Sequence, residues 1–336
     1  MRNNKRIEIF DIIKGISAIF IIITHFVFTR EQRLQHLFPF YIDTAVPFYM
    51  MITGYFFYDT FEKVKSYKIR DFYKKLNLNK RIGRLLFPYL FIIIIEIIIF
   101  IYIDRQFEVI NIINKGGWGP GSYYTFVSIQ IVFMAPIIYF LFKKNSKITF
   151  AAIIVLDIIY NIYIAPLSSD AYRMLSLRYI IFILLGIRLN RSIKNNENIK
   201  ISLIFILIGF IFILGYNYLG YTPKIYFNWS NASSFPVALY AYGIVFILYK
   251  GYIRFEKKFN NFFFNFFSLL GKASYHIFLF QMLFYGPLTD IKYNVDGLIK
   301  KFNFYPSLII CIIICLIGGL LFYYFEQWIR KKINKK

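Results

Sequence analysis

The chain has 336 residues, of which 58% are hydrophobic and only 17% are charged. Soluble globular domains average roughly 45 to 50% apolar and about 25% charged residues, so this composition excludes an ordinary soluble domain and predicts a polytopic membrane protein. The formal net charge of +23 does not indicate a nucleic-acid partner, because the cations lie in short loops between apolar runs.

About ten apolar runs have the length of a membrane-spanning helix, which takes about 20 residues. They cover residues 9–28, 40–58, 85–103, 123–142, 148–165, 174–189, 201–219, 236–253, 266–286 and 306–328. The first run contains His25 and no small-residue cleavage site follows it, so we expect a retained span and not a signal peptide. The sequence predicts an all-α membrane helical bundle that forms one domain over residues 1–336 in the plasma membrane.

Basic residues alternate between rich and poor loops along the chain. The rich segments are the amino terminus, residues 63–84, 143–147, 188–200 and 250–258, and the tail from Arg330. Together they hold 28 Lys and Arg, whereas the intervening loops hold nine. Because cytoplasmic loops carry the excess of Lys and Arg, we expect both termini on the cytoplasmic side.

Two loops are long enough to carry function. Residues 59–84 are basic, and we expect them to be partly helical on the cytoplasmic face. Residues 104–122 end in the glycine-rich sequence GGWGPGS. Trp118, Tyr123 and Tyr124 border the outer end of the fourth predicted span, where an aromatic belt is expected.

His25 is a polar side chain in the first predicted span, eleven residues beyond Lys14 and therefore about 16 Å along a helix. A neutral imidazole can lie at that depth, and it is the commonest general base for taking a proton from a hydroxyl. The alternative is a hydrogen-bonded histidine of the core or the interface. His36 and His276 have weaker claims, and neither is given a chemical role.

Glu96 interrupts the apolar run FIIIIEIII about 18 Å along a helix from Arg84, so it can reach a depth similar to that of His25. There it can orient the imidazole, or it can be a carboxyl that ties helices together. Asp157 in the fifth span allows the same two interpretations, of which packing is favoured.

Arg81 and Arg84 in KRIGRLLFPY lie three residues apart and so share one helix face at the cytoplasmic entry to the third span. Paired guanidinium groups can hold phosphates, but arginines at this position can also be simple positive-inside anchors. Asp11 and Lys14 have the spacing of a local ion pair.

Several kinds of site are absent from the sequence. It contains no phosphate-binding GxxxxGK[ST] loop, no HExxH and no GxSxG, which disfavours an ATP-driven pump and a zinc protease. The two cysteines, Cys311 and Cys315, lie in one apolar run and are expected in the core. We therefore predict no metal site.

Five segments together resemble the acyltransferase 3 family of bacterial integral-membrane O-acyltransferases. They are RIEIFDIIKGISAIFIIITH at 6–25, DTAVPFYMMITGYFF at 43–57, KRIGRLLFPY at 80–89, GWGPGSYYTFVSIQIVFMAP at 117–136 and GKASYHIFLFQ at 271–281. The sequence departs from the family pattern at Lys14, where arginine is common, and at Gln281, where many members have a second histidine.

The resemblance implies a catalytic role for His25 and a role for Arg81 and Arg84 in holding the acyl donor, usually acetyl-coenzyme A. Some members carry a fused extracellular hydrolase-like domain that this chain lacks, so a partner protein of envelope assembly is expected to complete the transfer. The acceptor implied is a hydroxyl of a cell-envelope or secreted polysaccharide. The alternative functions are a transporter or flippase of a sugar- or acyl-lipid, and a scaffold for an envelope-assembly complex.

Overall fold

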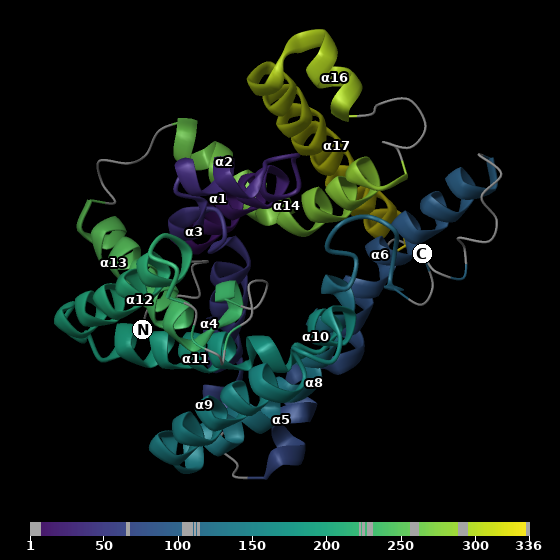
Figure 1. The fold of residues 1–336 in the computed structure, drawn as a ribbon. Helices are drawn as coiled ribbons and strands as arrows, with labels where there is room; N and C mark the ends of the chain where they lie inside the picture. Colours follow the sequence, from purple (N-terminus) through teal and green to yellow (C-terminus); the bar gives the residue numbers. More distant parts are fainter. Residues whose placement is uncertain are drawn as a thin grey trace. The chain divides into compact units, whose positions relative to one another are not determined.

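The protein is described by a computed structural model that covers residues 8–64, 68–102, 110, 112, 115–221, 223, 226, 231–255, 262–287 and 295–333. All regular elements within these ranges are helices, so the predicted all-α fold is confirmed (Figure 1). The first seven and the last three residues lie outside the described ranges, as do residues 103–109 of the second long loop. The cytoplasmic placement of both termini stays a prediction.

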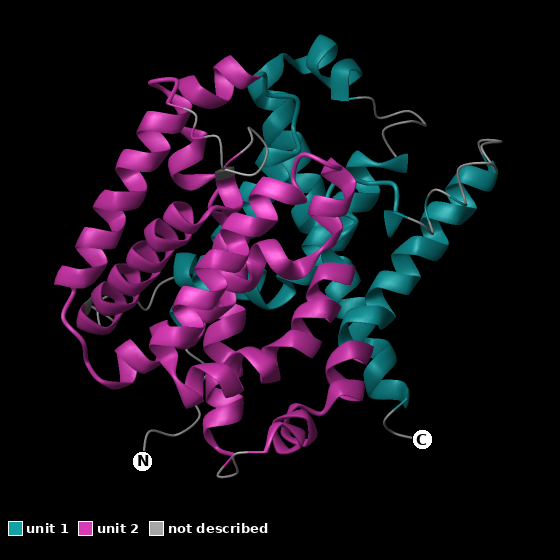
Figure 2. Cartoon of the chain, turned by 60° about the horizontal axis from the view of Figure 1, so that its bottom comes forward, with its two compact units in different colours: residues 1–29, 84–125, 259–336 teal, residues 30–83, 126–258 magenta. Residues whose placement is uncertain are grey.

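The chain divides into two compact units (Figure 2). Unit 1 consists of residues 1–29, 84–125 and 259–336, and unit 2 of residues 30–83 and 126–258. Each unit is assembled from segments that are far apart in the sequence.

Unit 1 is built around two helices that pack closely side by side. Its helices are α1 (Glu8–Thr24), most of α6 (Leu78–Tyr102), α14 (Phe262–Tyr285), α16 (Val295–Phe302) and α17 (Phe304–Ile333). A Cβ atom on Gly15 of α1 would lie 2.1 Å from the Phe267 carbonyl oxygen, and one on Gly271 of α14 would lie 1.8 Å from the Asp11 carbonyl oxygen. Glycine at these positions lets the two backbones approach as small residues do between membrane helices.

Unit 2 contains the remaining described helices, and glycines allow two of them to approach closely, as in unit 1. They are α2 (Arg30–Gln35), α3 (Phe38–Tyr41), α4 (Ala45–Glu62), α5 (Ile69–Leu76), the start of α6, most of α8 (Tyr124–Lys144), α9 (Ser146–Tyr163), α10 (Ser169–Met174), the 3-10 turns η1 (Ser176–Tyr179) and η2 (Asn231–Ser233), α11 (Ile180–Lys194), α12 (Lys200–Asn217) and α13 (Phe235–Phe255). Gly54 of α4 and Gly186 of α11 face the partner helix so closely that a Cβ atom would lie 2.2 Å and 2.0 Å from its carbonyl oxygens. The helix α5 confirms that the basic loop is partly helical.

Stripes of exposed large apolar side chains identify the faces that contact lipid. On α6, Leu90, Ile94, Ile98 and Ile101 are 50 to 59% exposed and recur every three or four residues, which places them on one helix face. A comparable stripe follows α17 through Ile309, Ile313, Ile317 and Leu321. Contiguous apolar surface of this kind marks contact with a membrane or a partner protein, and a bilayer accounts for stripes on several long helices.

Six helices of the described chain are long and apolar enough to cross a membrane: α6, α8, α9, α12, α13 and α17. The other four predicted spans correspond to α1, α4, α11 and α14, which are helices as expected. Helices α1 and α11 have only 17 and 15 residues, and α11 is buried along nearly its whole length. The count of ten spans therefore stays a prediction.

Candidate active site

A glycine-rich loop within unit 1 forms the framework of the candidate site. Gly117 and Gly121 have φ angles of 127° and 84°, a backbone region that L side chains rarely adopt. A Cβ atom on Gly119 would lie only 1.9 Å from the carbonyl oxygen of Met282 on α14. The glycines thus allow the loop to turn sharply and to lie directly against α14.

Glu96 is fully buried on α6 and is bound to this loop. Its Oε2 atom accepts a hydrogen bond of 3.1 Å from the backbone N–H of Trp118, whose ring packs against Phe100. Its Oε1 atom has no hydrogen-bond partner among the described residues. One turn of the loop is further held by Tyr89, whose hydroxyl donates to the Gly116 carbonyl oxygen at 2.8 Å.

His25 follows the last residue of α1 and is half-buried. Its Nε2 atom lies 3.8 Å from the point that a Cβ atom on Gly121 would occupy. The ring of Phe278 on α14 borders the same point at 3.0 Å and packs against Tyr124 with 5.0 Å between ring centroids. The structure therefore places His25 and Glu96 against the same glycine-rich loop, His25 at Gly121 and Glu96 at Trp118.

The two arginines of the Arg-x-x-Arg pair lie on one helix, α6, and differ in their surroundings. Arg81, in unit 2, donates from Nη2 to the Thr60 hydroxyl at 3.0 Å, and its guanidinium lies 5.1 Å from the centre of the Phe57 ring. Arg84, in unit 1, is exposed. Twelve residues separate Arg84 from Glu96 along α6, about 18 Å of helix.

Asp157, a buried carboxyl of α9, takes part in a hydrogen-bonded network within unit 2. Its Oδ1 accepts from the Asn161 amide at 3.3 Å and its Oδ2 from the Tyr226 hydroxyl at 3.4 Å. The network continues through the Tyr172 hydroxyl, which donates to Asn161 at 3.2 Å and bonds the Ser233 hydroxyl at 2.8 Å. These contacts agree with the packing interpretation of Asp157.

Several other charged residues of unit 1 are paired with one another. Lys14 and Asp11 form the expected ion pair on α1 at 2.8 Å. His276 of α14 contacts the Glu326 carboxylate of α17 through Nε2, and Glu326 accepts from Arg330 at 2.5 Å. Sequence reasoning missed this pairing because the partners are 50 residues apart. It joins α14 to α17.

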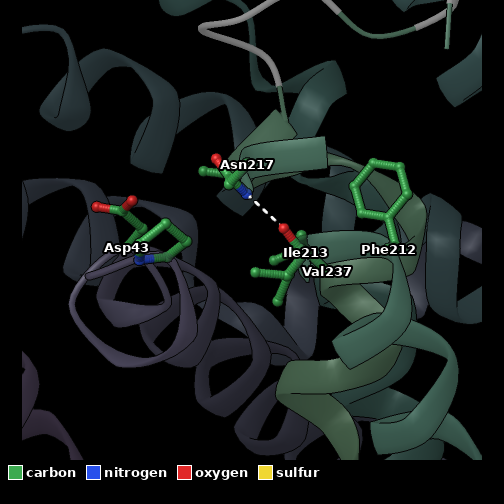
Figure 3. Close-up of a pocket in the computed structure, with 7 residues that line it drawn as sticks. Asp43, Phe212, Ile213, Asn217 and Val237 are labelled. Atoms are coloured by element: carbon green, nitrogen blue, oxygen red, sulfur yellow. Dashed lines mark hydrogen bonds between the residues drawn. The ribbon is translucent and has the colours of Figure 1, made fainter. Parts of the chain in front are cut away.

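The described residues contain no candidate metal centre. They contain no cluster of three or more His, Cys, Asp or Glu able to hold a metal ion, and Cys311 and Cys315 are free thiols in the core. Figure 3 shows a small cavity within unit 2, in which the Asn217 amide donates to the Ile213 carbonyl oxygen at 2.9 Å. The cavity is lined by Pro39, Asp43, Phe212, Ile213, Asn217, Ala232 and Val237. It has room for about one water molecule, too little for an acyl donor.

Comparison with known proteins identifies the family. A family model described as an acyltransferase domain matches residues 7–325 of the chain. The chain belongs to the acyltransferase 3 family. A search of curated proteins and a search of solved structures found no match. Membership in the acyltransferase 3 family and the long apolar helices make the protein an acyltransferase built on membrane helices.

The face that α14 turns to the glycine-rich loop was not recognised as part of the site from the sequence. Phe278 and Met282, four residues apart, border Gly121 and Gly119, and Gln281 lies between them. The signal that could have revealed this face is the helical spacing of Gly271, Phe278 and Met282. Apolar residues at that spacing are indistinguishable from ordinary core residues until the packing is known.

Proposed function

We propose that the protein transfers an acyl group from acyl-coenzyme A on the cytoplasmic side to a hydroxyl of a cell-envelope or secreted polysaccharide. The acyl group that we propose is acetyl. The observation that carries this proposal is the placement of His25 and Glu96 against one glycine-rich loop in a member of an acyltransferase family. The protein then acts in the plasma membrane, with an envelope-assembly protein as a partner.

Acyl transfer to a hydroxyl group requires a general base, and His25 is the group best suited to that role. The imidazole takes the proton of the acceptor hydroxyl while the hydroxyl oxygen attacks the thioester carbonyl carbon. The carbon–sulfur bond then breaks, and the thiolate of coenzyme A leaves with the proton that the imidazole carries. Glu96 supports His25 by fixing the loop that borders the ring, since its carboxyl accepts the N–H of Trp118. No metal ion is needed for this sequence of steps.

The donor's phosphates require cations, and Arg84 is exposed at the start of the helix that carries Glu96. We infer that Arg84, together with Arg81, holds the anionic head of the donor. About 18 Å of α6 separates Arg84 from Glu96, a length that an extended pantetheine arm can cover. The acceptor then approaches from the outer side.

The experiment that tests the proposal is the replacement of His25 by alanine in the purified membrane protein. We expect His25→Ala to lose acetyl transfer from acetyl-coenzyme A by a factor on the order of 1000, because a general base contributes roughly 100- to 10,000-fold. His36→Ala is the matched control, since His36 is exposed and lies in unit 2, whereas the glycine-rich loop belongs to unit 1. Full acetyl transfer in the His25 variant would exclude this role of His25. No acetyl transfer by the wild type would instead favour a transporter or scaffold.

Mass spectrometry of envelope glycans from cells with and without the gene tests the acceptor. We expect a two-carbon ester to disappear when the gene is removed and to stay absent when only the His25→Ala protein is made.

A further inference from the structure

Gln281 of α14 is a fully buried amide. Its side chain has 0% exposure, and neither Oε1 nor Nε2 has a hydrogen-bond partner among the described residues. An amide buried without compensating hydrogen bonds destabilises the fold. Buried polar groups are otherwise almost always bonded, so this one needs an explanation, and a bound substrate group supplies one.

The fold brings Gln281 to the level of His25. Helices α1 and α14 meet at Gly15 and Gly271, where a Cβ atom on Gly15 would lie 3.1 Å from the Gly271 nitrogen. The carboxyl-terminal half of α14 lies beside that of α1, because Phe278 and His25 both border Gly121. His25 lies ten residues beyond Gly15 and Gln281 ten beyond Gly271, so each is about 15 Å past the contact.

Several backbone N–H groups of the glycine-rich loop are not available to a reacting carbonyl group. Four of its backbone N–H groups are already bonded: Gly117 to Ile112 at 2.8 Å, Trp118 to Glu96 at 3.1 Å, Ser122 to Gly119 at 3.2 Å and Tyr124 to Gly121 at 2.8 Å. Acyl transfer places negative charge on the carbonyl oxygen, and preorganised donors for that charge contribute strongly to catalysis. Gln281 lies on α14 between Phe278 and Met282, which contact the loop, and its amide is a donor with no acceptor among the described residues.

We propose that Gln281 is a catalytic residue whose side-chain N–H donates to the carbonyl oxygen of the acyl thioester. The inference rests on the proposed acyltransferase function and deepens it. As the acceptor oxygen bonds to the carbonyl carbon and its proton moves to His25, the carbonyl π electrons move onto the oxygen that Gln281 binds. When this oxyanion collapses, the carbon–sulfur bond breaks and the thiolate takes the proton from His25.

Gln281→Leu separates this role from a structural one. We expect kcat with acetyl-coenzyme A to fall on the order of 100-fold with KM unchanged, because the interaction forms only in the transition state. The thermal midpoint should stay the same or rise, since the variant removes an unbonded polar group. Gln281→His keeps an N–H donor and should recover part of the lost kcat.

Asn190→Leu is the matched control in unit 2. Asn190 is also an amide with 0% exposure. Its Oδ1 has no partner among the described residues, but its Nδ2 donates to the Tyr55 carbonyl oxygen at 3.0 Å and so joins α11 to α4. This variant should show a lower thermal midpoint, while kcat per folded molecule is unchanged. The two variants are thus expected to behave in opposite ways. The Gln281 variant loses activity and keeps its stability, whereas the Asn190 variant loses stability and keeps its activity.

The outcomes distinguish a failure of the role of Gln281 from a failure of the proposed acyltransferase function. Wild-type turnover with an unchanged kcat in Gln281→Leu would overturn the role of Gln281, and would mean that its amide binds at most a water molecule. A parallel loss of kcat and thermal midpoint would overturn it also, because that pattern reports a structural role. No acetyl-coenzyme A turnover by the wild type would overturn the proposed function, and the role of Gln281 with it.

Discussion

Each unit buries a carboxyl group in the middle of an apolar helix, Glu96 in unit 1 and Asp157 in unit 2, and the surroundings of the two carboxyls differ. In unit 2, both carboxylate oxygens of Asp157 are bonded, to Asn161 and Tyr226. In unit 1, Glu96 uses one oxygen to hold the backbone of a glycine-rich loop, and its other oxygen has no partner among the described residues. From the sequence alone the two residues allow the same interpretations.

In the proposed mechanism, this difference separates a carboxyl that stabilises the fold, Asp157, from one that supports the chemistry, Glu96. A fully bonded network fixes helices relative to one another within its unit, because breaking it would leave buried polar groups unpaired. A carboxylate oxygen without a partner costs stability and is retained where a function needs it. Unit 1 also contains His25 and the amide of Gln281, which has no hydrogen-bond partner among the described residues.

The largest expected effect comes from exchanging the carboxyls one at a time. Glu96→Leu removes the carboxylate that accepts the Trp118 N–H, so the glycine-rich loop beside His25 is no longer held in place, and we expect kcat to fall on the order of 1000-fold, within the roughly 100- to 10,000-fold that a general base contributes. Asp157→Asn should leave kcat per folded molecule unchanged and lower the free energy of unfolding by about 1 kcal/mol. Turnover and thermal unfolding of both purified variants measure the contrast. Equal loss of kcat in the two variants would remove the distinction between the units.

A smaller effect is expected from the glycine that brings the loop against α14. Alanine at Gly119 would place its Cβ atom 1.9 Å from the Met282 carbonyl oxygen, so the loop must move. A displacement of about 1 Å at an active site can cost roughly 100-fold in rate, and we expect that loss in kcat for Gly119→Ala. Gly251→Ala in α13 is the control, because nothing lies within 4 Å of the added Cβ atom. If the two glycine variants behave alike in a turnover assay, the loop does not position the site.

The sequence predicted the helices of this molecule better than the packing of its site. Long apolar runs and alternating basic loops indicate spans because length and composition act locally along the chain. His25, Glu96 and the arginine pair stood out because polar groups in apolar runs are rare. That Glu96 binds the N–H of Trp118, 22 residues away, depends on the turn that three glycines allow, and no local pattern reveals it.

The role of α14 shows the same limit more clearly. Gln281 could be recognised in the sequence as a departure from the family pattern, but its missing hydrogen bonds are a property of the packed unit. The pairing of His276 with Glu326 likewise depends on α14 and α17 lying side by side. Polar residues within spans were therefore visible from the sequence, whereas the distinction between bonded and unbonded ones was not.

The smallest expected effect concerns the two arginines of α6, which differ as the two carboxyls do. Arg84 is exposed, so Arg84→Ala should raise KM for acetyl-coenzyme A about 10-fold, equivalent to about 1.4 kcal/mol of donor binding, without changing the thermal midpoint. Arg81 also bonds Thr60 and lies over Phe57, so Arg81→Ala should lower the thermal midpoint as well. Raising the salt concentration should increase the wild-type KM more than that of the Arg84 variant, since screening weakens a contact that the variant no longer makes. A KM that is unchanged in the Arg84 variant at low salt would show that this arginine only anchors α6 at the membrane surface.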